Sequence, residues 1–212
     1  MRSKILLLIS TLFLIAQNAV AVPIGTIAIY SDGSARKLLA QGEGQLVWED
    51  DRKRQFTVSE NPIMPVLELK YFLGDRGYQQ HLKSGQPGGI HSLPYGSKVE
   101  FSVKRTRHTG ESSARNYGCV RLESARQKIL GKQRQLERYR CERFTYHRKF
   151  WTKQVKEKRE FTYSPELGLA VDLSRQTSKR STKKRLVALI APGETSLKQV
   201  NRILRKIRTR KK

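Results

Sequence analysis

The sequence predicts a mainly β domain, a curved antiparallel sheet or half-barrel with a C-terminal α-helix. Two observations indicate the sheet: short segments alternate apolar and polar residues, and Gly, Pro and Asp-Gly turns separate them at regular spacing. A third indicates the helix, because the last apolar residues recur at intervals of three and four. We therefore divide the chain into a signal peptide over 1–21, an antiparallel β domain over 22–193 and a basic amphipathic helix and tail over 194–212.

The first 21 residues have the composition of a secretory signal peptide. Arg2 and Lys4 precede an apolar run over 5–16, and Ala19-Val20-Ala21 offers the small residues of a cleavage site. No other long apolar run follows, so we expect no transmembrane span. These features predict an exported, periplasmic protein whose mature chain begins near Val22.

The sequence predicts ten strands besides those of the cysteine-containing region, together with a polar loop and a basic connection. That loop covers 106–115, and a basic, mobile connection is predicted over 174–185. The predicted strands cover residues 25–30, 45–49, 55–59, 66–73, 78–83, 98–104, 150–155, 159–163, 169–173 and 186–190.

Both cysteines lie in a central stretch that reads as a hairpin. If Cys119 and Cys141 are antiparallel partners, the turn falls at Leu130 and Gly131, where glycine suits a positive φ. Directly opposed residues have Cα atoms roughly 4.5 or 5.5 Å apart, which a disulfide accepts. In an oxidising compartment two cysteines usually pair. The alternative is a short helix over 122–129, with apolar residues at spacings of three and four.

The same residues resemble a family. A cysteine strand, Gly131 in the turn, the second cysteine and Tyr163-Ser-Pro-Glu-Leu-Gly168 are similar to uncharacterised Gram-negative periplasmic proteins of the DUF3108-like kind. Asp32-Gly33, Val47-Trp48 and the turn over 93–96 extend the resemblance upstream, whereas the turn at 129–133 keeps only the glycine. The resemblance implies an envelope protein and brings no known activity.

A second, degenerate resemblance concerns catalysis. Gly118-Cys119-Val120-Arg121-Leu122 is similar to the motif of the L,D-transpeptidases, cysteine enzymes that need a histidine before the glycine. This chain has Tyr117 there, and a tyrosine with a pKa near ~10 is a poor base at neutral pH. The four histidines show no metal-type spacing. We therefore predict no catalytic residue, no metal and no cofactor, with a degenerate transpeptidase as the alternative.

The charge predicts an anionic partner. Lys and Arg number 43 against 18 Asp and Glu, a formal net charge of +25. The predicted C-terminal helix has an apolar side that either packs on the sheet or lies on a membrane. Its basic side supplies the candidate anion-binding residues Lys198, Arg202, Arg205, Lys206 and Arg208.

The functional prediction is a non-catalytic, envelope-associated binding or structural protein. Its partner would be lipid head groups, lipopolysaccharide or an acidic wall polymer. Cations and aromatics also mix over 138–163, as in nucleic-acid binders. Alternation on a strand explains that mixture more simply, as an aromatic core face with cations outside, so nucleic acid is the less favoured partner.

Overall fold

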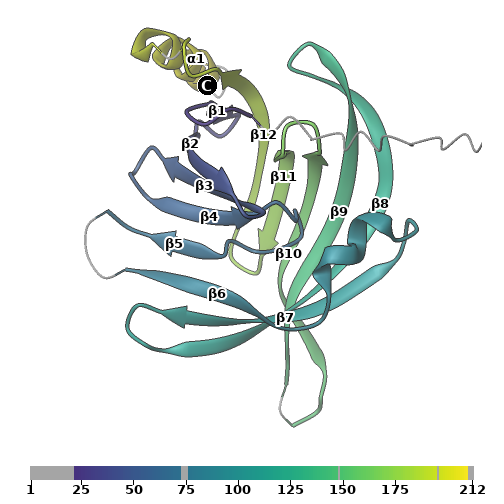
Figure 1. The fold of residues 1–212 in the computed structure, drawn as a ribbon. Coiled ribbons are helices and arrows are strands. Elements are labelled where there is room, and N and C mark those ends of the chain that lie inside the picture. Colours follow the sequence, from purple (N-terminus) through teal and green to yellow (C-terminus); the bar gives the residue numbers. More distant parts are fainter. Residues whose placement is uncertain (1–21, 73–75, 148, 195, 210–212) are drawn as a thin grey trace, which may run out of the picture.

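The protein is a closed antiparallel barrel of 12 strands in this computed structural model (Figure 1). The structure describes residues 22–72, 76–147, 149–194 and 196–209, without the side chains of Leu197 and Arg208, so the predicted signal peptide lies outside the described part. Each strand pairs with the next, and β1 pairs with β12 from Ile27 opposite Ile190 to Tyr30 opposite Leu186. The β class and C-terminal helix are confirmed. The half-barrel is corrected to a closed barrel, because this last pairing removes both sheet edges.

The elements follow one another with short connections. The first six strands are β1 (Ile27–Tyr30), β2 (Ala35–Gly42), β3 (Gln45–Asp50), β4 (Gln55–Ser59), β5 (Glu68–Lys70) and β6 (Gly77–Ser84). A 3₁₀-helix, η1 (Pro87–Ser92), precedes β7 (Lys98–Arg107), β8 (Ser112–Ile129) and β9 (Lys132–Tyr146). The chain ends with β10 (Lys153–Ser164), β11 (Leu169–Thr177), β12 (Ser181–Ile190) and α1 (Leu197–Thr209).

The predicted central hairpin is formed by β8 and β9. Cys119 lies opposite Cys141, and a disulfide joins them with Cα atoms 4.0 Å apart. A bulge between Leu122 and Ala125 shifts the register by one residue, which leaves a two-residue turn at Leu130-Gly131 with φ of 51° and 84°. Two positive φ angles match the twist of a hairpin. The helical alternative for 122–129 is wrong, since these residues belong to β8.

Two predicted connections are strands instead. The loop over 106–115 shrinks because β7 runs to Arg107 and β8 starts at Ser112. The connection over 174–185 is mostly β11 and β12, which pair from Asp172 opposite Arg185 to Gln176 opposite Ser181. Their polar, basic sequences lack the apolar alternation of a strand, and only their pairing with neighbouring strands identifies these segments as β-structure.

Two further differences concern the strands themselves. The sequence does not predict β2, and the two strands expected over 150–155 and 159–163 are one strand, β10.

One end of the barrel is closed by two connections. Ile63, between β4 and β5, and Ile90, in η1, are fully buried against the inward side chains of β7 to β9. Asn61 donates a side-chain hydrogen bond to the carbonyl of Pro87 at 2.9 Å, which ties the two connections together. His91 of η1 has Nδ1 2.8 Å from the hydroxyl of Tyr139. We call this the plugged end.

Helix α1 packs on the outside of the barrel, beside β1 and β12 (Figure 1). Ile207 is 8% exposed and contacts Ile29 and Ile190, which point away from the barrel interior. Ser196 caps the helix, since its Oγ accepts from the Gln199 N–H at 3.1 Å. Of the two alternatives for the apolar side, packing on the sheet is therefore the one observed. In the described part of the chain, α1 and η1 are both too short and polar to cross a membrane.

Candidate anion-binding site in the barrel mouth

The end opposite the plug is lined by basic side chains. Successive turns of an antiparallel barrel alternate between its ends, so the turns β1–β2, β3–β4, β5–β6, β7–β8, β9–β10 and β11–β12 share this end. Eight cations occupy inward positions near it, seven on strands and one, Arg54, directly before β4, and we call them the cationic mouth. They are Arg36, Arg54, Arg105, Arg115, Arg143, Arg159, Arg175 and Lys184.

Their inward direction follows from strand alternation. Residues two apart point to the same face of a strand, and each of these cations lies two positions from a residue of the barrel core. Arg159 precedes Phe161, Arg143 follows Cys141 and Lys184 precedes Leu186 in this way. All the mouth cations except Arg175 are half-buried, so they are held partly out of solvent.

Aromatic rings support the cations from the core side. The guanidinium carbon of Arg36 is 4.5 Å from the ring centroid of Phe56 and 5.6 Å from that of Tyr30. Lys184 Nζ lies 4.3 Å from the same Tyr30 ring. Such cation–π contacts stabilise a positive charge without neutralising it. The cations therefore stay available to an anion.

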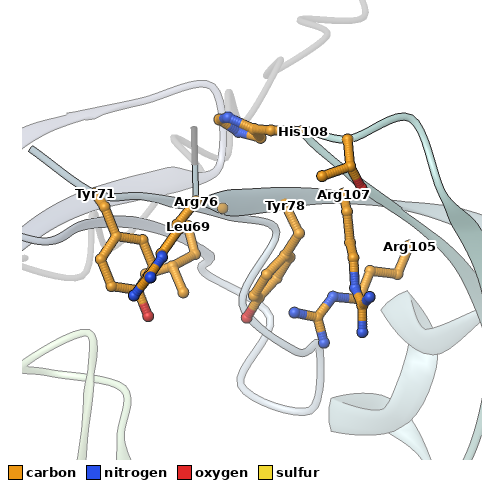
Figure 2. Close-up of a pocket in the computed structure, with 9 residues that line it drawn as sticks. Leu69, Tyr71, Arg76, Tyr78, Arg105, Arg107 and His108 are labelled. Atoms are coloured by element: carbon orange, nitrogen blue, oxygen red, sulfur yellow. The ribbon is translucent and has the colours of Figure 1, made fainter. Parts of the chain in front are cut away.

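The same layer continues around the barrel at β5 to β7. A cavity of about 260 Å³ lies here. Figure 2 shows the rings of Tyr71 and Tyr78 on the same side of the ribbon as the Arg105 side chain. The Arg105 guanidinium carbon is 3.6 Å from the Tyr78 ring centroid. Burial, followed by the charge of Arg115, lowers the pKa of Arg105. His108 also lines the cavity, and Figure 2 shows it on the other side of the ribbon from Tyr78. The cavity thus presents more positive charge beside aromatic rings.

One buried carboxylate, that of Glu157, forms ion pairs with three of the arginines. Glu157 Oε2 is 2.8 Å from Arg175 and 3.6 Å from Arg143, and its Oε1 is 3.5 Å from Arg159. Burial alone would raise the pKa of Glu157, but the hydrogen bond from Arg175 and the charges of the three arginines outweigh it and lower the pKa. One negative charge cannot neutralise three positive ones, so a positive excess remains.

The open cavity of the mouth is also lined by more positive than negative side chains. Its volume is about 720 Å³, and its lining includes seven cations and three carboxylates. Asp50 is already engaged, since its Oδ2 accepts from Arg54 Nε at 2.7 Å. Burial and the neighbouring charge of Arg36 lower the pKa of Lys184 to about 8, against a weaker opposing effect of Asp32. The charge of Arg36 thus adds to burial in disfavouring the protonated amine of Lys184.

Three mouth arginines also have spare donors. Arg105 Nε, Arg143 Nε and Arg159 Nη2 are buried and have no acceptor among the described residues. Buried N–H groups normally have a partner, because an unpaired one costs free energy. Guanidinium groups bind the paired oxygens of phosphate, sulfate and carboxylate with two parallel hydrogen bonds. The arrangement can therefore hold an oxyanion.

The structure separates the predicted site residues from this mouth. Lys198, Arg202, Arg205 and Lys206 are exposed on α1, outside the barrel wall, and no described ion pair includes them; the Arg208 side chain lies outside the described part. Cys119 and Cys141 are buried within the barrel as a disulfide, so neither presents a thiol. Among the described residues no group of His, Cys, Asp and Glu could hold a metal ion.

The region of mixed cations and aromatics divides between the two faces. Arg143 and Arg159 point inward, and Arg159 has its guanidinium carbon 5.5 Å from the ring centroid of Tyr117. Arg138 and Arg140 instead pair with Glu160 on the outer face, at 3.2 and 3.6 Å. The interpretation as an aromatic core with cations outside thus holds for only part of this region. The signal that finds the mouth is a cation two positions from an apolar residue near a strand end.

Comparisons with known proteins add a remote structural likeness. No protein-family model matches the sequence, and no curated protein matches it. Among solved structures, the hypothetical lipoprotein YmcC from Escherichia coli (K12) is similar, with a TM-score of 0.46 and 10% sequence identity over 81% of this chain and 89% of that one. At this level of similarity it supports no statement about function.

Proposed function

We propose that this protein is an exported, envelope-associated, non-catalytic binding protein that holds an anionic ligand in the cationic mouth. The observation that carries the proposal is the convergence of half-buried inward cations with buried, unpaired guanidinium donors. The predicted leader over 1–21 and the disulfide support export, because disulfides persist mainly in oxidising compartments.

The arrangement costs stability unless an anion is bound. Arg159 lies directly opposite Arg175 across β10 and β11, and like charges in such a pair destabilise a sheet. A bound oxyanion would reduce this repulsion and accept the spare hydrogen bonds. Because the side chains are partly removed from water, each charge acts more strongly on a ligand than an exposed one does.

The chemistry of the mouth favours phosphate, sulfate or carboxylate groups. Seven of its eight cations are arginines, whose planar forks match two oxygens at once. Lipid head groups, lipopolysaccharide and acidic wall polymers all carry such groups. The helix cations remain a separate prediction for the outer surface.

The test is titration calorimetry with inorganic pyrophosphate at low ionic strength. We expect one site whose affinity falls as salt rises. Arg159→Gln should weaken binding at least about tenfold, because a charged hydrogen-bonding group is lost. Arg202→Gln removes the same charge from α1 and should change the affinity by less than about twofold. Equal losses in the two variants would contradict the proposal.

A further inference from the structure

A third, mostly apolar cavity lies inside the barrel next to the cationic mouth. Its volume is about 170 Å³, and it runs between β3–β4 and β10–β11. We call it the inner chamber. Its apolar lining includes Tyr30, Trp48, Phe56, Val58, Phe161 and Leu169.

The chamber and the mouth share residues. Arg36 and Leu173 line both the chamber and the open mouth cavity, and Arg159, another mouth cation, lines the chamber. The Arg36 guanidinium lies over the Phe56 ring, which places positive charge at the edge of an apolar space. A ligand held by Arg36 and Arg159 would therefore have the chamber directly beside its anionic group.

Apart from the arginines, several polar groups around the chamber are already engaged in hydrogen bonds. Tyr30 donates its hydroxyl hydrogen to the carbonyl of Ala170 at 3.3 Å, and Tyr163 donates to that of Glu60 at 3.4 Å. The amide of Asn61 donates to Pro87 and accepts from the Ile63 N–H. A sugar or nucleobase would find few partners here, and its own polar groups would be desolvated without compensation. An apolar group suits the space better.

We infer that the ligand is an anionic amphiphile, with its acidic head on Arg36 and Arg159 and an apolar group in the inner chamber. The inference rests on the proposed function and adds the chemical class of the ligand. An apolar cavity of about 150 Å³ in another protein stays dry and binds benzene, so the chamber matches a ring or a short alkyl chain.

The experiment compares two phosphate esters that differ only in the alkyl group. The chain has two tryptophans, Trp48 in the chamber and Trp151, which is 79% exposed. In a Trp151→Phe protein, Trp48 therefore reports on the chamber alone. Hexyl phosphate should bind at least about tenfold more tightly than methyl phosphate, because it buries more apolar surface. Only hexyl phosphate should change the emission of Trp48.

A filled chamber supplies the matched control. Val58→Phe, in the Trp151→Phe protein, should abolish the advantage of hexyl phosphate and leave methyl phosphate unchanged. Val66→Phe repeats the test at another lining position if the first variant does not fold. Arg159→Gln should weaken both esters by the same factor.

Each outcome decides between the two proposals. Equal affinity for the two esters, with pyrophosphate still bound, would overturn the amphiphile and leave the anion site standing. Failure of pyrophosphate and both esters to bind would remove the proposed function as well. Tighter binding of adenosine monophosphate than of hexyl phosphate would also overturn the inference, in favour of a nucleotide.

Discussion

The cationic mouth and the basic face of α1 carry the same kind of charge in opposite settings. The described cations of α1 are exposed, on a helix whose apolar side is used in packing on Ile29 and Ile190. Those of the mouth are mostly half-buried, five of the eight lie over aromatic rings, and three have spare buried donors. Exposed charges are screened and contribute little, whereas partly buried ones act at a lower effective dielectric. Placement, rather than number, thus distinguishes a binding site from a solvated surface.

Two substitutions in the mouth should therefore weaken anion binding more than four substitutions on the helix. We expect Arg36→Gln with Arg159→Gln to weaken pyrophosphate binding about 100-fold, because two charge-assisted contacts are lost. Neutralising all four described helix cations, Lys198, Arg202, Arg205 and Lys206, should cost less than about threefold. Titration calorimetry on both proteins measures this. A larger loss from the helix variant would reverse the comparison.

The helix should matter for stability rather than for binding. Ile207→Asp places a charge against Ile29 and Ile190, so the free energy of unfolding should fall by about 2–3 kcal/mol. Denaturant unfolding measures the loss, and pyrophosphate affinity of the folded variant should stay within about twofold. Lys206→Ala, at an exposed neighbour, should change stability by less than about 0.5 kcal/mol. A binding loss in Ile207→Asp would link α1 to the mouth.

Removal of the Glu157 carboxylate should lower the stability of the protein and raise its affinity for anions. Glu157→Gln leaves Arg143, Arg159 and Arg175 without their common counter-ion, so we expect stability to fall by about 1–3 kcal/mol. Anion affinity should rise about fivefold as the positive excess grows. Since the pKa of Glu157 is lowered, its stabilisation is present above the ordinary glutamate pKa and is lost as pH falls. The free energy of unfolding should therefore differ less between pH 4 and pH 7 in Glu157→Gln than in the wild type. The same difference in both proteins would contradict this role of Glu157.

The smallest effect is a pH dependence from Lys184. Its pKa of about 8 means that the amine loses its charge between pH 7 and pH 9, so sulfate, whose charge is constant there, should bind about threefold more weakly at pH 9. Lys184→Arg keeps the charge and should flatten this profile. The lowered pKa also means that the burial penalty is fully present below pH 8 and is relieved as pH rises toward the ordinary lysine value. A wild-type profile as flat as that of Lys184→Arg would exclude Lys184 from the site.

The sequence predicts the hairpin and the helix because both are local. Cys119 and Cys141 predict two opposed strands, Gly131 predicts the turn, and the apolar spacing predicts α1. The bulge that shifts the register by one residue between the cysteines and the turn is not predicted by these residues. Barrel closure depends on β1 pairing with β12, about 160 residues away, and strand alternation is the same in an open sheet. Sequence therefore predicts the strand faces without predicting that the sheet closes.

The sequence does not predict the cationic mouth, for a related reason. Arg115 lies in the segment predicted as a loop, and Arg175 and Lys184 lie in the predicted basic connection. Inward cations break the apolar alternation that identifies a strand, so the strand ends that form the site were the least recognisable as strands. The helix cations lie close together in the sequence, whereas the mouth cations lie one each on seven strands and one in the turn before β4.

The most direct test of the account is the position of a bound oxyanion. We would collect anomalous diffraction from crystals of the protein soaked in selenate and locate the selenium atoms. The account predicts the strongest site inside the mouth, within hydrogen-bonding reach of Arg159 and Arg36. Selenate found only along Lys198 and Arg202 on the outside of α1 would contradict it and return the site to the helix.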